Sequence, residues 1–215
     1  MLKDLKLKDI IMLDEEILKD DNRSLVKVVN VKGEKIVVKQ PREKNRRKWI
    51  RFWTLFRDSE VKKEFESMMF LKKNLIKGLE PIKYEEIKKM GMVVDSYLLY
   101  RYQEGVTSDK NDISEIIKII KKIHKLGYLH GDAQFRNFIK SPEGKIVVID
   151  FKVKKKLLGK FSEAFEYIVL ENSVGEIDKE INFIKNTNYY KLAKFFNDFF
   201  REIRKIKKKI RVWRK

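Results

Sequence analysis

Cysteine is absent from the 215-residue sequence, and histidine occurs only twice, as His124 and His130. Without cysteine, disulfide scaffolds, thiolate zinc sites and cysteine nucleophiles are excluded, and a reducing compartment is the expected environment. Two histidines are too few for a typical histidine-based metal site. Nine glycines and three prolines also exclude collagen-like and low-complexity chains.

Long apolar runs are also missing, since no segment approaches the ~20 apolar residues that span a bilayer. Lysines and acids interrupt the N-terminal stretch MLKDLKLKDIIMLDEE, unlike the apolar core of a signal peptide. We therefore expect a cytoplasmic protein, with peripheral contact to the inner face of the inner membrane as a further expectation. Hydrophobic residues make up 43% of the chain, enough to bury a core and to exclude intrinsic disorder.

Positive charge dominates the composition, because 51 Lys and Arg against 32 Asp and Glu give a formal net charge of +19. Such an excess indicates an anionic partner: nucleic acid, an anionic membrane or a phosphorylated substrate. The alternative is that many lysines only solvate the surface. No recognised nucleic-acid-binding motif accompanies the charge, so nucleic acid is the least favoured of these partners.

The first half of the chain is expected to be rich in strands. Residues 23–40 have the β-branched runs and the central turn of a hairpin. Two further strand-like runs lie near 82–89 and 92–102, and Ser59 is placed to cap the helix that follows it.

A basic insert separates the hairpin from the capped helix. Residues 42–57 (REKNRRKWIRFWTLFR) contain seven basic residues and one acid and predict a helix. Trp49, Trp53 and Phe56 recur at i, i+4 and i+7, so they share one face. This face can pack on the fold or meet a membrane surface, and the sequence leaves both alternatives open.

The second half predicts mainly helices. Asp112 and Glu115 have the spacing of a capping box for a helix that begins at Ile113, and Gly127 suits its C-terminal end. The buried stripe of this helix is predicted at positions 113, 116, 117, 120 and 123.

The C-terminal segment 201–215 holds nine basic residues and one acid. Ile203, Ile206, Ile210 and Trp213 fall on one face of a predicted helix. Such a helix can dock on the fold or lie on an anionic membrane, and docking is the favoured alternative.

These patterns divide the chain near residues 103–106. We expect an α+β fold of two lobes. Residues 1–103 would form an antiparallel-sheet N-lobe with one main helix and the basic insert, and residues 104–215 a small helical C-lobe.

Two residues of the first half fit a nucleotide site. Lys39 lies late in a strand, and Glu64 lies on the following helix, with Glu66 as a neighbouring candidate. A lysine on a rigid strand can hold nucleotide phosphates, and a glutamate on the packed helix can hold the lysine. We therefore predict that Lys39 and Glu64 are nucleotide-binding residues.

Three residues of the second half complete the pattern. Asp132 follows His130-Gly131, Asn137 comes five residues later, and Asp150 closes the strand KIVVIDF. Asp132 is the predicted catalytic residue, which orients an acceptor hydroxyl and takes its proton. Asn137 and Asp150 offer the hard oxygen donors that suit Mg²⁺ and nucleotide, while His130 is assigned a structural role. The joint order is that of a protein-kinase-like fold, with ATP and Mg²⁺ as the expected cofactors.

The chain departs from the kinase pattern in three places. No G-x-G-x-x-G precedes the Lys39 strand, and the corresponding turn falls near residues 19–22. Gly131 stands where many kinases have an arginine that reads an activation-loop phosphate, and Lys152 stands where glycine usually follows Asp-Phe. The segment after Phe151 has no Ser, Thr or Tyr before Ser162 and no A-P-E motif, which argues against phospho-regulation. His-Gly-Asp in place of His-Arg-Asp points toward kinases of small molecules and sugars.

The segments VVKQPREKNRRKWIRFWTLFRDSE, KKEFESMMFLKKNL, LHGDAQFRNF and VVIDFK resemble the bacterial lipopolysaccharide core heptose(II) kinase family, which is related to the Kdo kinases. The resemblance implies ATP-dependent phosphorylation of a heptose hydroxyl in the inner core of lipopolysaccharide, an anionic glycolipid. It carries over Asp132 as the catalytic residue, Lys39 and Glu64 as the nucleotide-holding pair, and Asn137 and Asp150 as magnesium ligands.

Two other functions remain as alternatives. A phosphotransferase of the aminoglycoside or choline type also uses His-Gly-Asp, but its cationic acceptors match a chain of net charge +19 poorly. A catalytically inactive kinase fold that binds a partner is favoured by the missing glycine-rich loop. The presence of all five predicted site residues opposes this second alternative.

Overall fold

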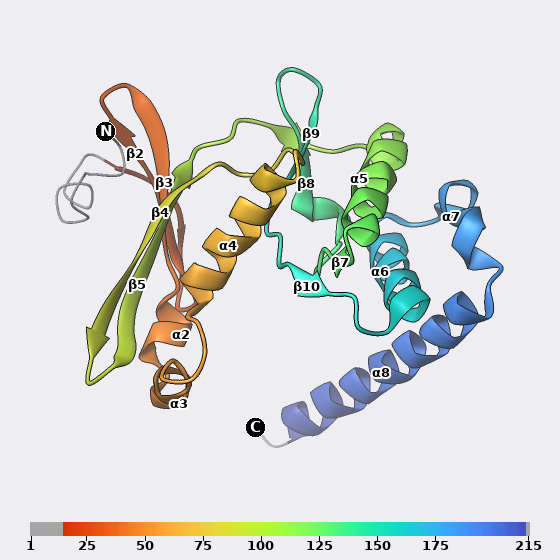
Figure 1. The fold of residues 1–215 in the computed structure, drawn as a ribbon. Coiled ribbons are helices and arrows are strands. Elements are labelled where there is room, and N and C mark those ends of the chain that lie inside the picture. The colour runs from red at the N-terminus through yellow and green to blue at the C-terminus, as the bar shows by residue number, and fades with distance from the viewer. Residues whose placement is uncertain (1–14, 214–215) are drawn as a thin grey trace. The chain divides into compact units, whose positions relative to one another are not determined.

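The computed structural model describes residues 15–213, which form two compact units (Figure 1). The first, here called the sheet unit, comprises residues 15–106 and 141–150. The second, here called the helical unit, comprises residues 107–140 and 151–213. Each unit has its own buried core and is described by itself.

The sheet unit is built on five antiparallel strands in the order β1-β2-β3-β5-β4. Their bounds are β1 (Glu15–Asp20), β2 (Leu25–Val31), β3 (Glu34–Gln40), β4 (Pro81–Lys89) and β5 (Met92–Arg101). The predicted hairpin is confirmed as β2 and β3, whose turn places Lys32 and Gly33 at positive φ. A two-residue turn of this kind matches the twist of the flanking strands.

Helix α4 (Glu60–Lys73) packs on one face of this sheet (Figure 1). Val61 and Met68 of the helix form a buried cluster with Leu98 of β5. The predicted cap is confirmed, because the Ser59 side chain accepts a hydrogen bond from the backbone N–H of Lys62 at 3.2 Å. The cap and the apolar face together fix where α4 begins and how it lies on the sheet.

The prediction of one continuous helix over 42–57 is wrong. The segment forms α2 (Arg42–Arg46) and α3 (Lys48–Trp53), separated by extended backbone at Arg47. The physical reason is the buried Asn45 side chain, which donates to Asp95 at 2.7 Å and accepts from Ser96 at 3.0 Å. These bonds tie the segment to β5, and tertiary contacts of this kind override helix propensity.

The helical unit contains four longer helices and a short strand pair. The helices are α5 (Ile113–Lys125), α6 (Gly159–Val174), α7 (Asp178–Lys185) and α8 (Asn188–Trp213), and β7 (Tyr128–Leu129) pairs with β10 (Lys154–Lys155). The predicted apolar stripe of α5 is confirmed, since the isoleucines at the five predicted positions are buried. Gly127, at φ 84°, follows the end of the helix as predicted.

The predicted capping box of Asp112 with Glu115 is wrong. Asp109 caps the short helix η2 (Lys110–Asp112), which precedes α5, and the box is formed by Asp109 and Asp112. Asp112 is occupied further by Lys140, whose Nζ donates to Asp112 Oδ1 at 2.8 Å. The capping residue is therefore Asp109, three residues before the predicted Asp112.

The remaining short elements are β6 (Val106–Thr107), η3 (Phe135–Asn137), β8 (Phe138–Lys140) and β9 (Ile146–Val148). The strand predicted over KIVVIDF is thus shorter than expected. The C-terminal segment is helical to Trp213, but the side chains of Ile210 and Trp213 lie outside the described residues. Among the described residues, no helix combines the length and apolar composition needed to cross a membrane.

Candidate functional site

The sheet unit brings Lys39 of β3 and Glu64 of α4 together. Lys39 Nζ lies 2.6 Å from Glu64 Oε1, and both side chains are largely shielded from solvent. Glu66, the neighbouring candidate, instead lies 3.9 Å from Lys62. The pair forms because β3 is an interior strand of the sheet and α4 is held against that sheet by its apolar face.

Asp150 belongs to the same unit as this pair. Burial, together with the carboxylates of Glu64 and Asp150, raises the pKa of the Tyr100 phenol above its usual range. The negative charges of Glu64 and Asp150 therefore both act on the Tyr100 phenol. The segment before Asp150 is attached to the sheet unit by the backbone N–H of Val148, which donates to the Lys77 carbonyl at 2.9 Å.

Asp150 also has an unusual backbone. Its φ of 49° lies in the left-handed region, where few residues other than glycine, asparagine and aspartate are found. Such conformations cost free energy and gather at functional sites. The observation marks Asp150 as a residue whose side-chain direction depends on a strained backbone.

The turn at the place of the missing glycine-rich loop is closed by an aspartate. Asp21 Oδ1 accepts hydrogen bonds from the backbone N–H groups of Arg23 at 2.8 Å and Ser24 at 2.7 Å. The bond from Ser24 is the main reason that the pKa of Asp21 lies below its usual range, although burial opposes it. In glycine-rich loops such amides face nucleotide phosphates, whereas here a carboxylate engages them.

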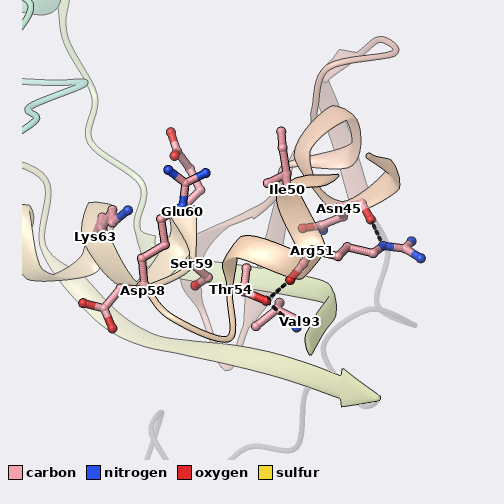
Figure 2. Close-up of a pocket in the computed structure, with 10 residues that line it drawn as sticks. Asn45, Ile50, Arg51, Thr54, Asp58, Ser59, Glu60, Lys63 and Val93 are labelled. Carbon is pink, nitrogen blue, oxygen red and sulfur yellow. Dashed lines mark hydrogen bonds between the residues drawn. The ribbon is translucent and has the colours of Figure 1, made fainter. Parts of the chain in front are cut away.

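A pocket of about 280 Å³ lies elsewhere in the sheet unit, between α3 and the start of α4 (Figure 2). Thr54 joins its walls, because its hydroxyl donates to the Arg51 carbonyl at 2.5 Å and accepts from the backbone N–H of Val93 at 2.8 Å. The residues that line this pocket do not include Lys39, Glu64 or Asp150. It is therefore separate from the predicted nucleotide site.

The helical unit places Asp132 and Asn137 in one loop. Asn137 Nδ2 donates to the backbone carbonyl of Asp132 at 2.8 Å, which ties the two residues together. The Asp132 carboxylate accepts from Gln134 Nε2 at 2.9 Å and lies 3.9 Å from Lys152 Nζ. These contacts hold the carboxylate in position, and neither Gln134 nor Lys152 was singled out from the sequence as its neighbour.

Glu166 of α6 holds the beginning of this loop. Its Oε2 accepts from the backbone N–H of His130 at 3.0 Å and its Oε1 from that of Gly131 at 2.8 Å. His124 Nε2 lies 2.8 Å from Oε2 and must donate, since a carboxylate only accepts. Burial of Glu166 opposes its ionisation, but these bonds outweigh it and keep the pKa of the carboxyl below its usual range.

His130 itself is fully buried. Its ring lies between those of Phe138, at 5.1 Å, and Phe151, at 5.2 Å between centroids. Its carbonyl accepts from the backbone N–H of Lys152 at 3.0 Å. The ring therefore packs inside the unit, beneath the loop that carries Asp132.

The residue before Asp132 is restricted to glycine by two features. Gly131 has φ 82°, and a Cβ at this position would lie 2.3 Å from the carbonyl oxygen of Lys152. A side chain here would be both strained and in collision with backbone. The departure from arginine noted in the sequence thus has a local steric cause.

The five predicted site residues fall into two groups. Lys39, Glu64 and Asp150 gather in the sheet unit, and Asp132 and Asn137 gather in the helical unit. Sequence reasoning missed Glu166. The available signal was an acid on the apolar face of a helix that is otherwise buried at Ala164, Tyr167 and Leu170. The roles of the five residues stay predictions.

No family model matches the chain, and no curated protein sequence matches it. A solved structure described as WaaP in complex with acyl carrier protein is similar in fold. The TM-score is 0.57 and the sequence identity is 14%, over 94% of this chain and 90% of that chain. At this identity the likeness shows the fold alone. With the antiparallel sheet, its helix α4 and the helical unit, it establishes a two-lobed, protein-kinase-like α+β fold, as the motif order predicted.

Substituting Gly131 tests its steric restriction. We expect Gly131→Ala to lower the free energy of unfolding by more than about 2 kcal/mol, because backbone strain and the contact with Lys152 add. Gly127→Ala is the matched control, since Gly127 has a similar φ of 84° and nothing within 4 Å of its Cβ position. Chemical denaturation measures both. Equal losses in the two variants would contradict the collision.

The Glu166 carboxylate predicts an acid-sensitive stability. Its pKa is below the value of about 4.3 in an unfolded chain, so its contribution is complete above that pH and is lost as pH falls through the folded pKa. We expect Glu166→Gln to be less stable than wild type at pH 7 by about 1–3 kcal/mol and to lose less stability on acidification. Denaturation midpoints between neutral and acid pH test this. Glu176→Gln, at an exposed position, should follow wild type. A parallel fall in wild type and Glu166→Gln would argue against the assignment.

Proposed function

We propose that this protein transfers the γ-phosphoryl group of ATP to a hydroxyl of an anionic glycolipid, and that the acceptor is a heptose in the inner core of lipopolysaccharide. The observation that carries the proposal is the Lys39–Glu64 ion pair of 2.6 Å in a kinase-like fold. Phosphoryl transfer depends on positioning and charge stabilisation, and a lysine held in this way serves both. The acceptor rests on the motif resemblance to heptose kinases.

Asp132 is proposed as the residue that receives the proton of the acceptor hydroxyl. Its carboxylate is directed by Gln134, at 2.9 Å from Oδ1, and faces the positive charge of Lys152, at 3.9 Å from Oδ2. A positioned base contributes about 10²–10⁴-fold to rate. Glu166 acts on this step only through the backbone on which Asp132 is carried.

Mg²⁺ bound together with nucleotide is the proposed cofactor, with Asn137 and Asp150 as its oxygen donors. The amide N–H of Asn137 donates a hydrogen bond to the Asp132 carbonyl. Its amide oxygen is therefore the atom proposed as a cation ligand. Asp150 offers a carboxylate on a strained backbone. Across residues 15–213, no cluster of three or more His, Asp or Glu residues could hold a metal by itself. Mg²⁺ commonly takes one or two carboxylates and the substrate phosphates, and when bound it would neutralise phosphate charge.

The charge of the chain supports an anionic acceptor. A net charge of +19 attracts a phosphorylated or carboxylated glycolipid and repels the cationic acceptors of aminoglycoside-type kinases. This attraction is screened at high salt. The same charge supports a peripheral position at an anionic membrane that carries the acceptor.

The catalytic assignment is tested by transfer from Mg-ATP to dephosphorylated lipopolysaccharide core, read by mass spectrometry. We expect wild type to add one phosphate to a core heptose and Asp132→Ala to be slower by at least about 100-fold, because the proton acceptor is gone. Thermal stabilisation by Mg-ATP should persist in the variant. Transfer at the wild-type rate by Asp132→Ala would refute its role. Absence of both transfer and nucleotide binding in wild type would favour an inactive kinase fold.

The ion pair is tested by a double-mutant cycle. Lys39→Ala and Glu64→Ala are each expected to reduce kcat/KM for ATP by at least about tenfold. The double variant should be little worse than either single variant, because residues that act as one pair are non-additive. The control is Lys62→Ala with Asp58→Ala, which removes a partly exposed ion pair of 2.6 Å at the start of the same helix and should leave transfer unchanged. Additive losses in the cycle would show that Lys39 and Glu64 act independently.

A further inference from the structure

Exposed apolar side chains gather on α3 and the turn that follows it. We call this surface the α3 patch, and its members are Trp49, Phe52, Trp53, Leu55 and Phe56. Trp49 is 67% exposed and Phe56 is 71% exposed, so one ring near each end of the patch is largely open to solvent. Contiguous exposed apolar surface of this kind marks a site of interaction.

The rings of the α3 patch support one another. Trp49 and Trp53 meet edge to face with centroids 5.4 Å apart, and Phe52 and Phe56 meet with centroids 5.8 Å apart. On the other side of the segment, Arg51 and Thr54 line the pocket of Figure 2. Ile50, Arg51 and Thr54 thus face the pocket, and the aromatic side remains exposed.

Basic residues surround the patch. Among the residues that the structure describes, no carboxylate pairs with Arg46, Lys48 or Arg57, and the Arg57 guanidinium lies 5.7 Å from the centre of the Trp53 ring. Positive charge without a carboxylate partner therefore lies within and beside the segment that carries the apolar surface.

The turn between β4 and β5 extends the same surface. A Cβ at Gly91 would lie 3.0 Å from the Leu55 side chain, so the turn touches the patch. Met90, at this turn, is 85% exposed, and Lys89 beside it is exposed. The exposed Met90 and Lys89 of this turn thus lie next to the α3 patch.

We propose that the α3 patch docks on the surface of an anionic phospholipid membrane. Tryptophan and phenylalanine side chains insert at the boundary between headgroups and acyl chains, and lysines and arginines bind anionic headgroups. The composition and this positive charge match that surface on both counts. The inference deepens the proposed function by naming the face that meets the membrane, but it does not depend on phosphoryl transfer.

Co-sedimentation with vesicles tests the proposal on the full chain. Vesicles of phosphatidylglycerol mixed with phosphatidylcholine provide the anionic surface, and vesicles of phosphatidylcholine alone provide the neutral one. Trp49→Ser with Phe56→Ser should reduce the partition coefficient on anionic vesicles by at least about tenfold. Arg46→Gln with Lys48→Gln and Arg57→Gln should reduce it comparably and weaken its dependence on salt.

The matched control lies on α8. Phe195 and Phe199 are 64% and 52% exposed, so Phe195→Ser with Phe199→Ser removes similar apolar surface from another basic helix. This variant should bind within about twofold of wild type, and circular dichroism melting should confirm that every variant is folded.

Several outcomes would overturn the proposal. These are wild-type binding by Trp49→Ser with Phe56→Ser, loss of binding confined to the α8 variant, or equal binding of wild type to both kinds of vesicle. Self-association that the α3 variant abolishes, without vesicle binding, would show instead that a second copy covers the patch. The assay contains no ATP, so a chain that binds vesicles but transfers no phosphate supports this inference and counts against the proposed function alone.

Discussion

The buried carboxylate of Glu166 imposes the tightest constraint on the helical unit. An ionised carboxylate away from water is costly unless donors surround it, and here three donors do so from two segments. His124 comes from α5, while the N–H groups of His130 and Gly131 come from the loop after β7. Satisfying one charge therefore fixes the backbone that leads into Asp132, and the position of the predicted catalytic residue follows from a residue that is not itself part of the chemistry.

The sheet unit uses polar contacts in a related way. Its apolar clusters determine that strands and α4 pack, but they are tolerant of small shifts, whereas hydrogen bonds and ion pairs are not. The Lys39–Glu64 pair sets the register of α4 against β3, and the buried Asn45 ties the basic segment to β5. Because Asn45 interrupts the helix, α3 starts anew at Lys48 and presents its aromatic side outward.

Elements with a clear hydrophobic period could be predicted from the sequence. The β2–β3 hairpin, the Ser59 cap and the isoleucine stripe of α5 depend on near neighbours, and the structure has them. The break at Arg47 depends on Asn45 and its partner Ser96, about 50 residues away. The hydrogen bond between Glu166 and the backbone of Gly131 joins residues 35 positions apart. No local pattern carries such information. The motif order pointed to the kinase-like fold because it records long-range arrangement indirectly, through spacing.

The backbone at Gly131 is sterically coupled to the backbone at Lys152. Its restriction arises from the carbonyl of Lys152, twenty-one residues later in the chain, together with its own left-handed backbone. A change from glycine to any other residue in the His-Gly-Asp motif is therefore accessible only after the backbone at Lys152 has moved and the peptide before Asp132 has turned. Replacing Gly131 by arginine in this chain therefore requires backbone rearrangement in two segments and not the exchange of a side chain alone.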